Sequence, residues 1–228
     1  MTKNRLNAVL IAATIFAFGC KKENNKVEYW NGSTHQIKAT YIQNGDKVPA
    51  NTTVSAVVND WGIMGYRLAS APYQNNSFEI ELLPTVNSQY LKTIDKLHII
   101  KGDIIVSNPE TGFCTLSIAA YSYEPTPGVM MEAFGGFKLF CESTRYDARY
   151  YYASQSVTVT GTYTHPTEIY TIIDTWDCYF QEGWNIVYSK YDYITNASME
   201  IQQTHTLYTT NRPQGSNFIW SYKSNWGY

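Results

Sequence analysis

Residues 170–191, YTIIDTWDCYFQEGWNIVYSKY, contain two runs with the alternation of a β-strand, joined by Gln181-Glu182-Gly183. In the first run Trp176, Cys178 and Phe180 recur at every second position, which is the period of a half-buried strand. A short connection that contains glycine is typical of a hairpin. We therefore predict an antiparallel pair centred on Glu182, with a shared face formed by Trp176, Cys178, Phe180, Trp184, Ile186 and Tyr188.

The same alternation dominates the rest of the chain, and no convincing amphipathic helix appears. Asn44-Gly45 is a strong hairpin signal, and Asn75-Asn76 indicates a second turn. Short strands at this spacing predict an all-β protein with one or two antiparallel β-sandwich domains. The strand after the second turn is expected to bury Phe78, Ile80 and Leu82 and to expose Glu79 and Glu81.

Two strand-like segments, GFCTLSIAAYSY (112–123) and GGFKLFCES (135–143), flank Pro125-Thr126-Pro127-Gly128. One register of this hairpin sets Cys114 opposite Cys141, close enough for a cross-strand disulfide. A shift by two residues keeps the same faces, so the register stays open. The alternative is that both cysteines, like Cys178, are apolar core thiols.

Two resemblances follow from quoted segments. IKATYIQNGDKVPANTTVSAVVND (37–60) with NNSFEIELLP (75–84) is similar to the transthyretin-like, carboxypeptidase-regulatory type of β-sandwich. SVTVTGTYT, EGWNIVYSK and TTNRPQGSNFIWSY resemble segments of small surface lipoproteins of Gram-negative gut anaerobes. The first resemblance implies a sandwich for residues 35–106, and we assign residues 107–228 to a second one. Most members of the second group lack an assigned activity. That resemblance therefore implies a location at the cell surface and no catalytic residue.

The N-terminus has the layout of a secretory signal peptide. Lys3 and Arg5 precede an apolar run over residues 8–18, which is shorter than the roughly 20 residues needed to span a membrane. The run ends at Gly19-Cys20, which resembles a bacterial lipobox and implies lipidation of Cys20. We therefore expect residues 1–19 to be cleaved, residues 20–34 to form a tether, and the lipid to anchor the protein in a membrane. Lys21, rather than Asp, after the cysteine favours the outer membrane; an ordinary signal peptide is the alternative.

Composition excludes one class of partner. The chain has 17 Lys and Arg against 19 Asp and Glu, a formal net charge of −2. Removal of residues 1–19 would take away Lys3 and Arg5 and no acid, so the mature chain is more acidic. Because a basic stretch for phosphate binding is missing, we expect no nucleic-acid partner.

Motifs for catalysis, metal binding or cofactor binding are also missing from the sequence. No histidine lies in a metal-binding spacing, and no nucleophile, phosphate-loop or dinucleotide motif occurs. Asp174 and Asp177 differ in strand parity and make a poor acid pair. We therefore expect a non-enzymatic protein without metal or cofactor. The four histidines are His35, His98, His165 and His205.

Aromatic residues are the remaining candidates for binding. Consecutive tyrosines point to alternate faces of a strand, so Tyr150, Tyr151 and Tyr152 are expected to expose at least one ring. Trp226 and Tyr228 are the other candidates, with Asn225 or Arg149 to orient ligand hydroxyls, whereas Trp220 and Tyr222 are assigned to the core. The sequence thus predicts a lipid-anchored accessory protein that binds a glycan or a surface partner. The alternatives are a fimbrial or adhesin-type structural subunit and a cell-surface hydrolase with two convergent carboxylates.

Overall fold

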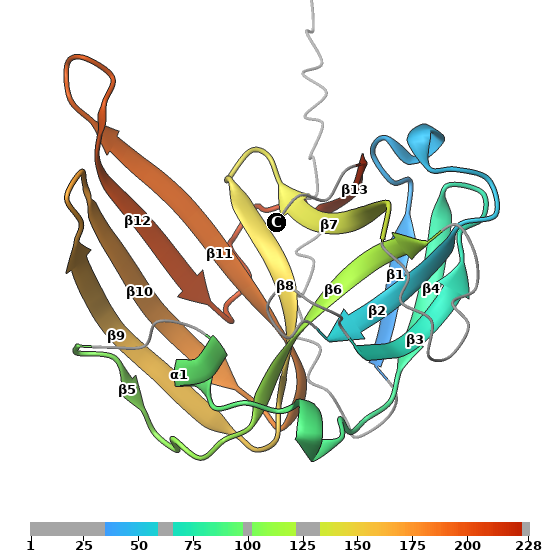
Figure 1. Cartoon of the computed structure of the whole chain (residues 1–228), viewed down its shortest axis with the longest axis horizontal. Coiled ribbons are helices and arrows are strands. Elements are labelled where there is room, and N and C mark those ends of the chain that lie inside the picture. Colours follow the sequence, from blue (N-terminus) through green and yellow to red (C-terminus); the bar gives the residue numbers. More distant parts are fainter. Residues whose placement is uncertain (1–34, 59–65, 98–101, 122–132, 225–228) are drawn as a thin grey trace, which may run out of the picture.

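The computed structural model describes residues 35–58, 66–97, 102–121 and 133–224 (Figure 1). The predicted all-β class is confirmed, because strands dominate and the described helices are short. The strands are β1 (His35–Thr40), β2 (Thr53–Val58), β3 (Tyr66–Pro72), β4 (Ser77–Leu82), β5 (Ile105–Val106), β6 (Phe113–Tyr121), β7 (Gly135–Cys141), β8 (Tyr146–Ala153), β9 (Val157–Pro166), β10 (Thr171–Phe180), β11 (Gly183–Thr195), β12 (Ile201–Thr209) and β13 (Ile219–Ser224). The helices are α1 (Ile94–Leu97) and the 3₁₀ turns η1 (Gly45–Lys47) and η2 (Ser88–Tyr90).

One sheet contains most of the strands. Its order is β3-β2-β6-β7-β8-β11-β12-β10-β9-β5, β13 is added on β7, and β6 also pairs with β8. Among the described strands the pairs are antiparallel except β10 with β12. A separate two-stranded sheet joins β1 to β4.

The hairpin predicted at residues 170–191 is wrong, although both of its strands exist. Strand β12 lies between β10 and β11: it pairs in parallel with β10 and antiparallel with β11. The residues expected to share one face therefore divide between two cores. Trp176, Cys178 and Phe180 belong to one, and Trp184 with Ile186 to the other.

The predicted hairpin at Asn44-Gly45 is also wrong. Asn44 does adopt a left-handed conformation (φ 59°), but η1 follows it and β1 pairs with β4 instead of β2. The Tyr73 hydroxyl donates to the Gly45 carbonyl oxygen at 3.0 Å. A side chain at residue 45 would collide with Asn76, so the glycine serves a close packing contact.

The turn predicted at Asn75-Asn76 is confirmed. Both residues have positive φ, 51° and 56°, and the amide and carbonyl groups of Gln74 and Ser77 bond to each other across the turn. In the strand that follows, Phe78, Ile80 and Leu82 are buried and Glu79 and Glu81 are exposed, as expected.

The β1–β4 sheet covers one face of the large sheet. Its buried side chains pack against β2, β6, β8 and β13, and Trp220 and Tyr222 complete this core, as predicted. The Trp184 indole donates to the Leu83 carbonyl oxygen at 2.9 Å and ties β11 to the end of β4. This first core comprises Ile37, Ala39, Ile42, Val54, Ala56, Val58, Phe78, Ile80, Leu82, Val86, Cys114, Leu116, Ile118, Ala120, Phe137, Tyr150, Tyr152, Trp184, Trp220 and Tyr222.

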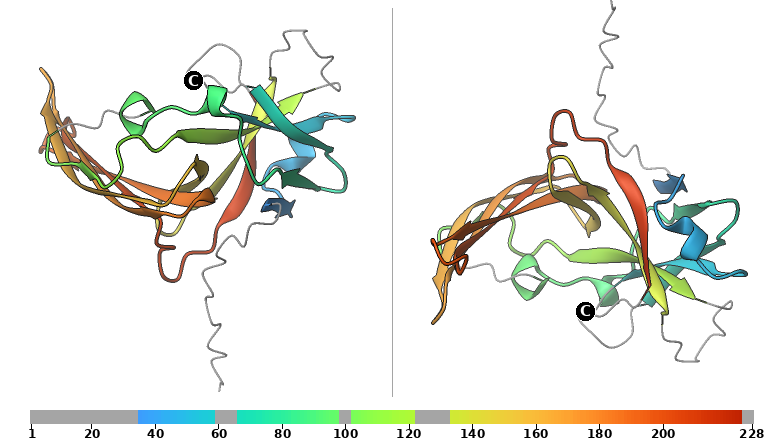
Figure 2. Two further views of the ribbon diagram at one scale, coloured as in Figure 1. Left: turned by 90° about the horizontal axis from the view of Figure 1, so that it is seen from below. Right: turned by 90° about the horizontal axis from the view of Figure 1, so that it is seen from above.

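Five neighbouring strands of the large sheet, in the order β8, β11, β12, β10 and β9, form a curved wing. The segment with α1 and β6 crosses the concave side of this wing (Figure 2). A second core fills the space beneath α1, where Ile94 and Leu97 pack against Phe113, Trp176 and Phe180. The large sheet also crosses the predicted domain boundary at residue 106, because β2 pairs with β6 and β5 pairs with β9.

The structure does not contain the predicted disulfide: Cys114, Cys141 and Cys178 are free and buried. The register that would set Cys114 opposite Cys141 also sets Ile118 opposite Phe137, and this second pair is present. Farther along, however, β8 enters and pairs with both strands. Cys114 then lies opposite Tyr152, and Cys141 opposite Tyr146, toward the other end of β8.

Candidate functional site

The tyrosine run of β8 is not the exposed platform that the sequence predicted. Tyr150, Tyr151 and Tyr152 are all buried. The reason is that this part of β8 has a core on each face: Tyr150 and Tyr152 lie in the first core, and Tyr151 lies in the second. Alternation along the strand therefore exposes none of the three rings.

The other predicted ligand-binding residues, Trp226 and Tyr228, lie outside the described residues, as do Asn225 and the lipidation candidate Cys20. Arg149, predicted to orient ligand hydroxyls, is described and exposed on β8. Arg149 lines a cavity that the sequence analysis did not predict.

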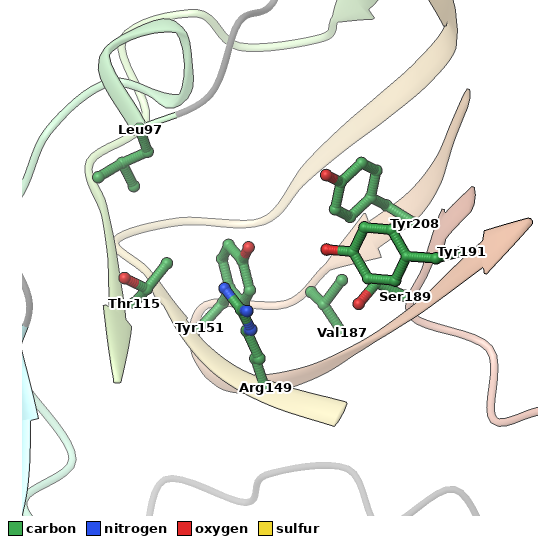
Figure 3. Close-up of a pocket in the computed structure, with 8 residues that line it drawn as sticks. All are labelled: Leu97, Thr115, Arg149, Tyr151, Val187, Ser189, Tyr191 and Tyr208. Atoms are coloured by element: carbon green, nitrogen blue, oxygen red, sulfur yellow. The ribbon is translucent and has the colours of Figure 1, made fainter. Parts of the chain in front are cut away.

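A cavity of about 180 Å³ lies on the concave side of the curved wing, next to Arg149. The floor comes from strands β8, β11 and β12, and the opposite wall from α1 and β6. Figure 3 shows this arrangement, with Leu97 and Thr115 on one side and the Tyr191 and Tyr208 rings on the other. The complete lining is Leu97, Thr115, Arg149, Tyr151, Val187, Ser189, Tyr191 and Tyr208.

Strand register explains why these side chains converge. Val187 lies opposite Arg149 in the β11–β8 pair, and Ser189 lies opposite Tyr208 in the β11–β12 pair. Residues at alternate positions of a strand share a face, so Val187, Ser189 and Tyr191 project from β11 to the same side. In Figure 3 the hydroxyls of Tyr191 and Tyr208 point toward the wall that contains Leu97 and Thr115.

Tyr151 and Tyr208 are held in their neutral, hydrogen-bonding form. Burial raises the pKa of Tyr151 and of Tyr208, and the nearby Tyr191 raises both further. The positive charge of Arg149 acts in the opposite sense on both pKa values without cancelling the shift. At neutral pH the cavity therefore presents phenol hydroxyls and one guanidinium cation.

The ring of Tyr208 packs against a neighbouring aromatic ring, that of Trp176. The Trp176 and Tyr208 rings stack with centroids 4.2 Å apart and planes 17° apart. Asp174 precedes Trp176 on the same face of β10 and lies opposite Thr206, whose hydroxyl bonds to it. Burial raises the pKa of Asp174, while that hydrogen bond and the charge of His205 lower it.

The cavity lining lacks the pair of carboxyl groups that glycoside hydrolysis uses. A glycosidase places two carboxyl groups on either side of the scissile bond, and the cavity lining contains no carboxylate. Within the described ranges, no group of three His, Cys, Asp or Glu side chains is placed to hold a metal ion. The described histidines have other neighbours: His35 packs edge-on against Tyr150, and His205 bonds to Thr175 at 3.0 Å.

Sequence reasoning missed Tyr191, Tyr208 and Ser189. One signal was present, because Tyr191 and Tyr193 recur at the strand period and both are exposed. The contribution of Tyr208 depends on the hairpin that joins β11 to β12, in which Ser189 lies opposite Tyr208, and sequence reasoning did not assign that pairing.

Comparisons with known proteins place the chain near none of them: no family model, no curated protein and no solved structure matches it. In the part of the chain that the structure describes, no helix is long and apolar enough to cross a bilayer.

Proposed function

We propose that the protein is a non-enzymatic accessory protein of the cell surface that binds a glycan in the cavity on the concave side of its curved sheet. The observation that carries this proposal is the convergence of three tyrosines, one serine and one arginine on a cavity of about 180 Å³. Small-molecule sites combine aromatic walls with a few placed polar groups, which is the composition found here.

The chemistry of these side chains suits a sugar. A pyranose has C–H groups on its faces, which pack on aromatic rings, and hydroxyls at its rim, which exchange hydrogen bonds with phenols and Ser189. The cavity is smaller than the roughly 300–1,000 Å³ of sites for drug-sized ligands. It therefore fits one sugar unit, with the rest of an oligosaccharide outside, where Tyr193 is 61% exposed on the same face of β11.

The proposal includes the membrane address. Cys20 would receive the lipid after removal of residues 1–19, residues 20–34 would form the tether, and the anchor would hold the protein in the outer membrane. Mass spectrometry of the membrane fraction tests this part. An unmodified Cys20 in a soluble species would contradict it.

The proposal also includes a sandwich-type arrangement around the first core, like the transthyretin-like resemblance of residues 37–84. Its support is the packing of the β1–β4 sheet against β2, β6 and β13. A solved structure in which this sheet separates from β2 and β6 would contradict it.

Glycan-array binding tests the function. The full chain, in a detergent without a sugar headgroup, should bind at least one carbohydrate, and Tyr191→Ala should weaken that binding about tenfold or more. Tyr179→Ala is the matched control, because Tyr179 is 56% exposed on the opposite face of the same wing. Equal loss in both variants, or no carbohydrate binding at all, would contradict the proposal.

A further inference from the structure

We infer, building on the proposed function, that the sugar unit held in the cavity carries a carboxylate and that Arg149 binds it. The ligand class would then be acidic glycans, those with uronic or sialic acid units. The inference depends on the charges that face the cavity and on which of them are already neutralised.

Arg149 is the only charged residue of the cavity lining. In the described part of the chain, no carboxylate forms an ion pair with it, and the ion pairs there join other residues, Lys38 to Glu79, Lys138 to Asp147 and Lys190 to Asp192. The guanidinium therefore lies at the cavity with its donors available to a ligand.

Two carboxylates on this face of the sheet, Asp147 and Asp174, have other partners. Asp147 precedes Arg149 by one strand period on β8 and forms its ion pair with Lys138 on β7. Asp174 on β10 bonds to Thr206. Neither neutralises Arg149, so a ligand carboxylate would meet an uncompensated positive charge.

An arginine at this position selects for a planar anion. Its donors form a fixed fork that matches both oxygens of a carboxylate, and such charge-assisted pairs are stronger than neutral hydrogen bonds. The Tyr191 hydroxyl can donate to the same oxygens or to ring hydroxyls. The chain as a whole is slightly acidic, so the attraction is local to this cavity.

The test uses pairs of oligosaccharides that differ only in the carboxyl group. Galacturonate, glucuronate, mannuronate and sialylated oligosaccharides are each compared with their carboxyl-reduced counterparts by calorimetry on the full chain. We expect at least one acidic member to bind about 10- to 100-fold more tightly than its reduced counterpart. Added salt should reduce this preference.

Two variants assign the preference to a residue. Arg149→Gln should lower the affinity for the acidic member about tenfold or more and remove most of the preference. Arg145→Gln removes the same charge from the exposed β7–β8 turn and should leave the preference intact. Circular dichroism and thermal melts of both variants confirm that the fold is retained.

The outcomes separate this inference from the proposed function. If carbohydrates bind through Tyr191 but the acidic and reduced members bind equally, or if Arg149→Gln retains the preference, the inference is wrong and the proposed function stands. If none of these oligosaccharides binds, the inference is wrong, and the glycan array decides the proposed function.

Discussion

Trp176 on β10 lies directly opposite Tyr208 on β12, and their rings stack at 4.2 Å across the parallel strand pair. This contact joins the second core to the wall of the cavity. Trp176 is 2% exposed, and Tyr208 reaches from it to the cavity lining. Stability of the wing and geometry of the site therefore depend on the same pair of rings.

Trp176→Ala should destabilise the fold by about 3–5 kcal/mol, because it removes a buried ring and leaves a cavity behind Tyr208. Chemical denaturation measures the change. Tyr179→Ala, on the exposed face of the same strand, should change the free energy of unfolding by only about 0.5 kcal/mol or less. A Trp176 variant as stable as the Tyr179 variant would show that the stack contributes nothing.

Gly161→Ala should detach β5 from β9. Gly161 has φ +125°, and a Cβ there would lie 2.1 Å from the Asp103 carbonyl oxygen, so both strain and collision oppose any side chain. We expect a loss of more than about 1 kcal/mol and faster amide exchange at Ser107, which donates to the Thr158 carbonyl oxygen.

Gly215→Ala is the control for this substitution. Gly215 also has positive φ, but a Cβ there would meet nothing within 4 Å. It reports the cost of strain alone, and a Gly161 variant that loses no more than this control would contradict the collision argument.

Asp174→Asn should stabilise the protein at neutral pH. Burial raises the pKa of Asp174 above its usual 3.8, so the native state holds the proton more tightly than the unfolded chain does. The ionised carboxylate therefore opposes folding above the native pKa, and this cost disappears as pH falls to about 3.8. The melting temperature of the variant should exceed that of the parent at pH 7, by a margin that shrinks on acidification.

Asp177→Asn serves as the control for the pH profile, because Asp177 is exposed on the other face of β10. This variant controls for the loss of one negative charge from the same strand. If the melting-temperature margin of Asp174→Asn over the parent instead grew as the pH fell, the raised pKa of Asp174 would be contradicted.

The three described cysteines should react in a fixed order. Burial raises the pKa of Cys114 and of Cys178 to about 12. At Cys141 burial acts the same way, but hydrogen bonds from Ser143 and Thr144 and from the backbone outweigh it and lower the pKa to about 7. Since the thiolate is the reactive form, Cys141 should be alkylated first as the β7–β8 turn opens.

Native alkylation with iodoacetamide at pH 8, followed by peptide mass spectrometry, gives this order directly. Cys141→Ser should abolish the fast phase. Modification of Cys114 or Cys178 at the same rate as Cys141 would contradict the assignment.

Local patterns predicted the strands and much of the burial. Alternation along β4 identified the buried Phe78, Ile80 and Leu82, and the C-terminal aromatics Trp220 and Tyr222 were assigned correctly to the core. These predictions succeed because the strand period reports which face of a single strand is apolar.

Strand partners could not be predicted in the same way. Backbone hydrogen bonds form between any two strands, so sequence favours the nearest neighbour when a turn is short. On this basis β1 was expected to pair with β2, and β10 with β11. Instead β1 pairs with β4, and β10 pairs with β12. The candidate site could not be predicted for the same reason. Its side chains Tyr151, Tyr191 and Tyr208 come together only because β8, β11 and β12 are adjacent in the sheet.

The position of β12 between β10 and β11 also bears on the order in which strand pairs form during folding. As the chain is synthesised, β10 and β11 emerge before β12, separated by only a short connection, so each presents an open edge to the other. Strand β12 pairs with β11 as a local hairpin, but its parallel pairing with β10 joins segments farther apart in the sequence and is slower to form. We expect the Trp176–Tyr208 contact to be acquired late in folding, so that ligand binding reports completion of the sheet.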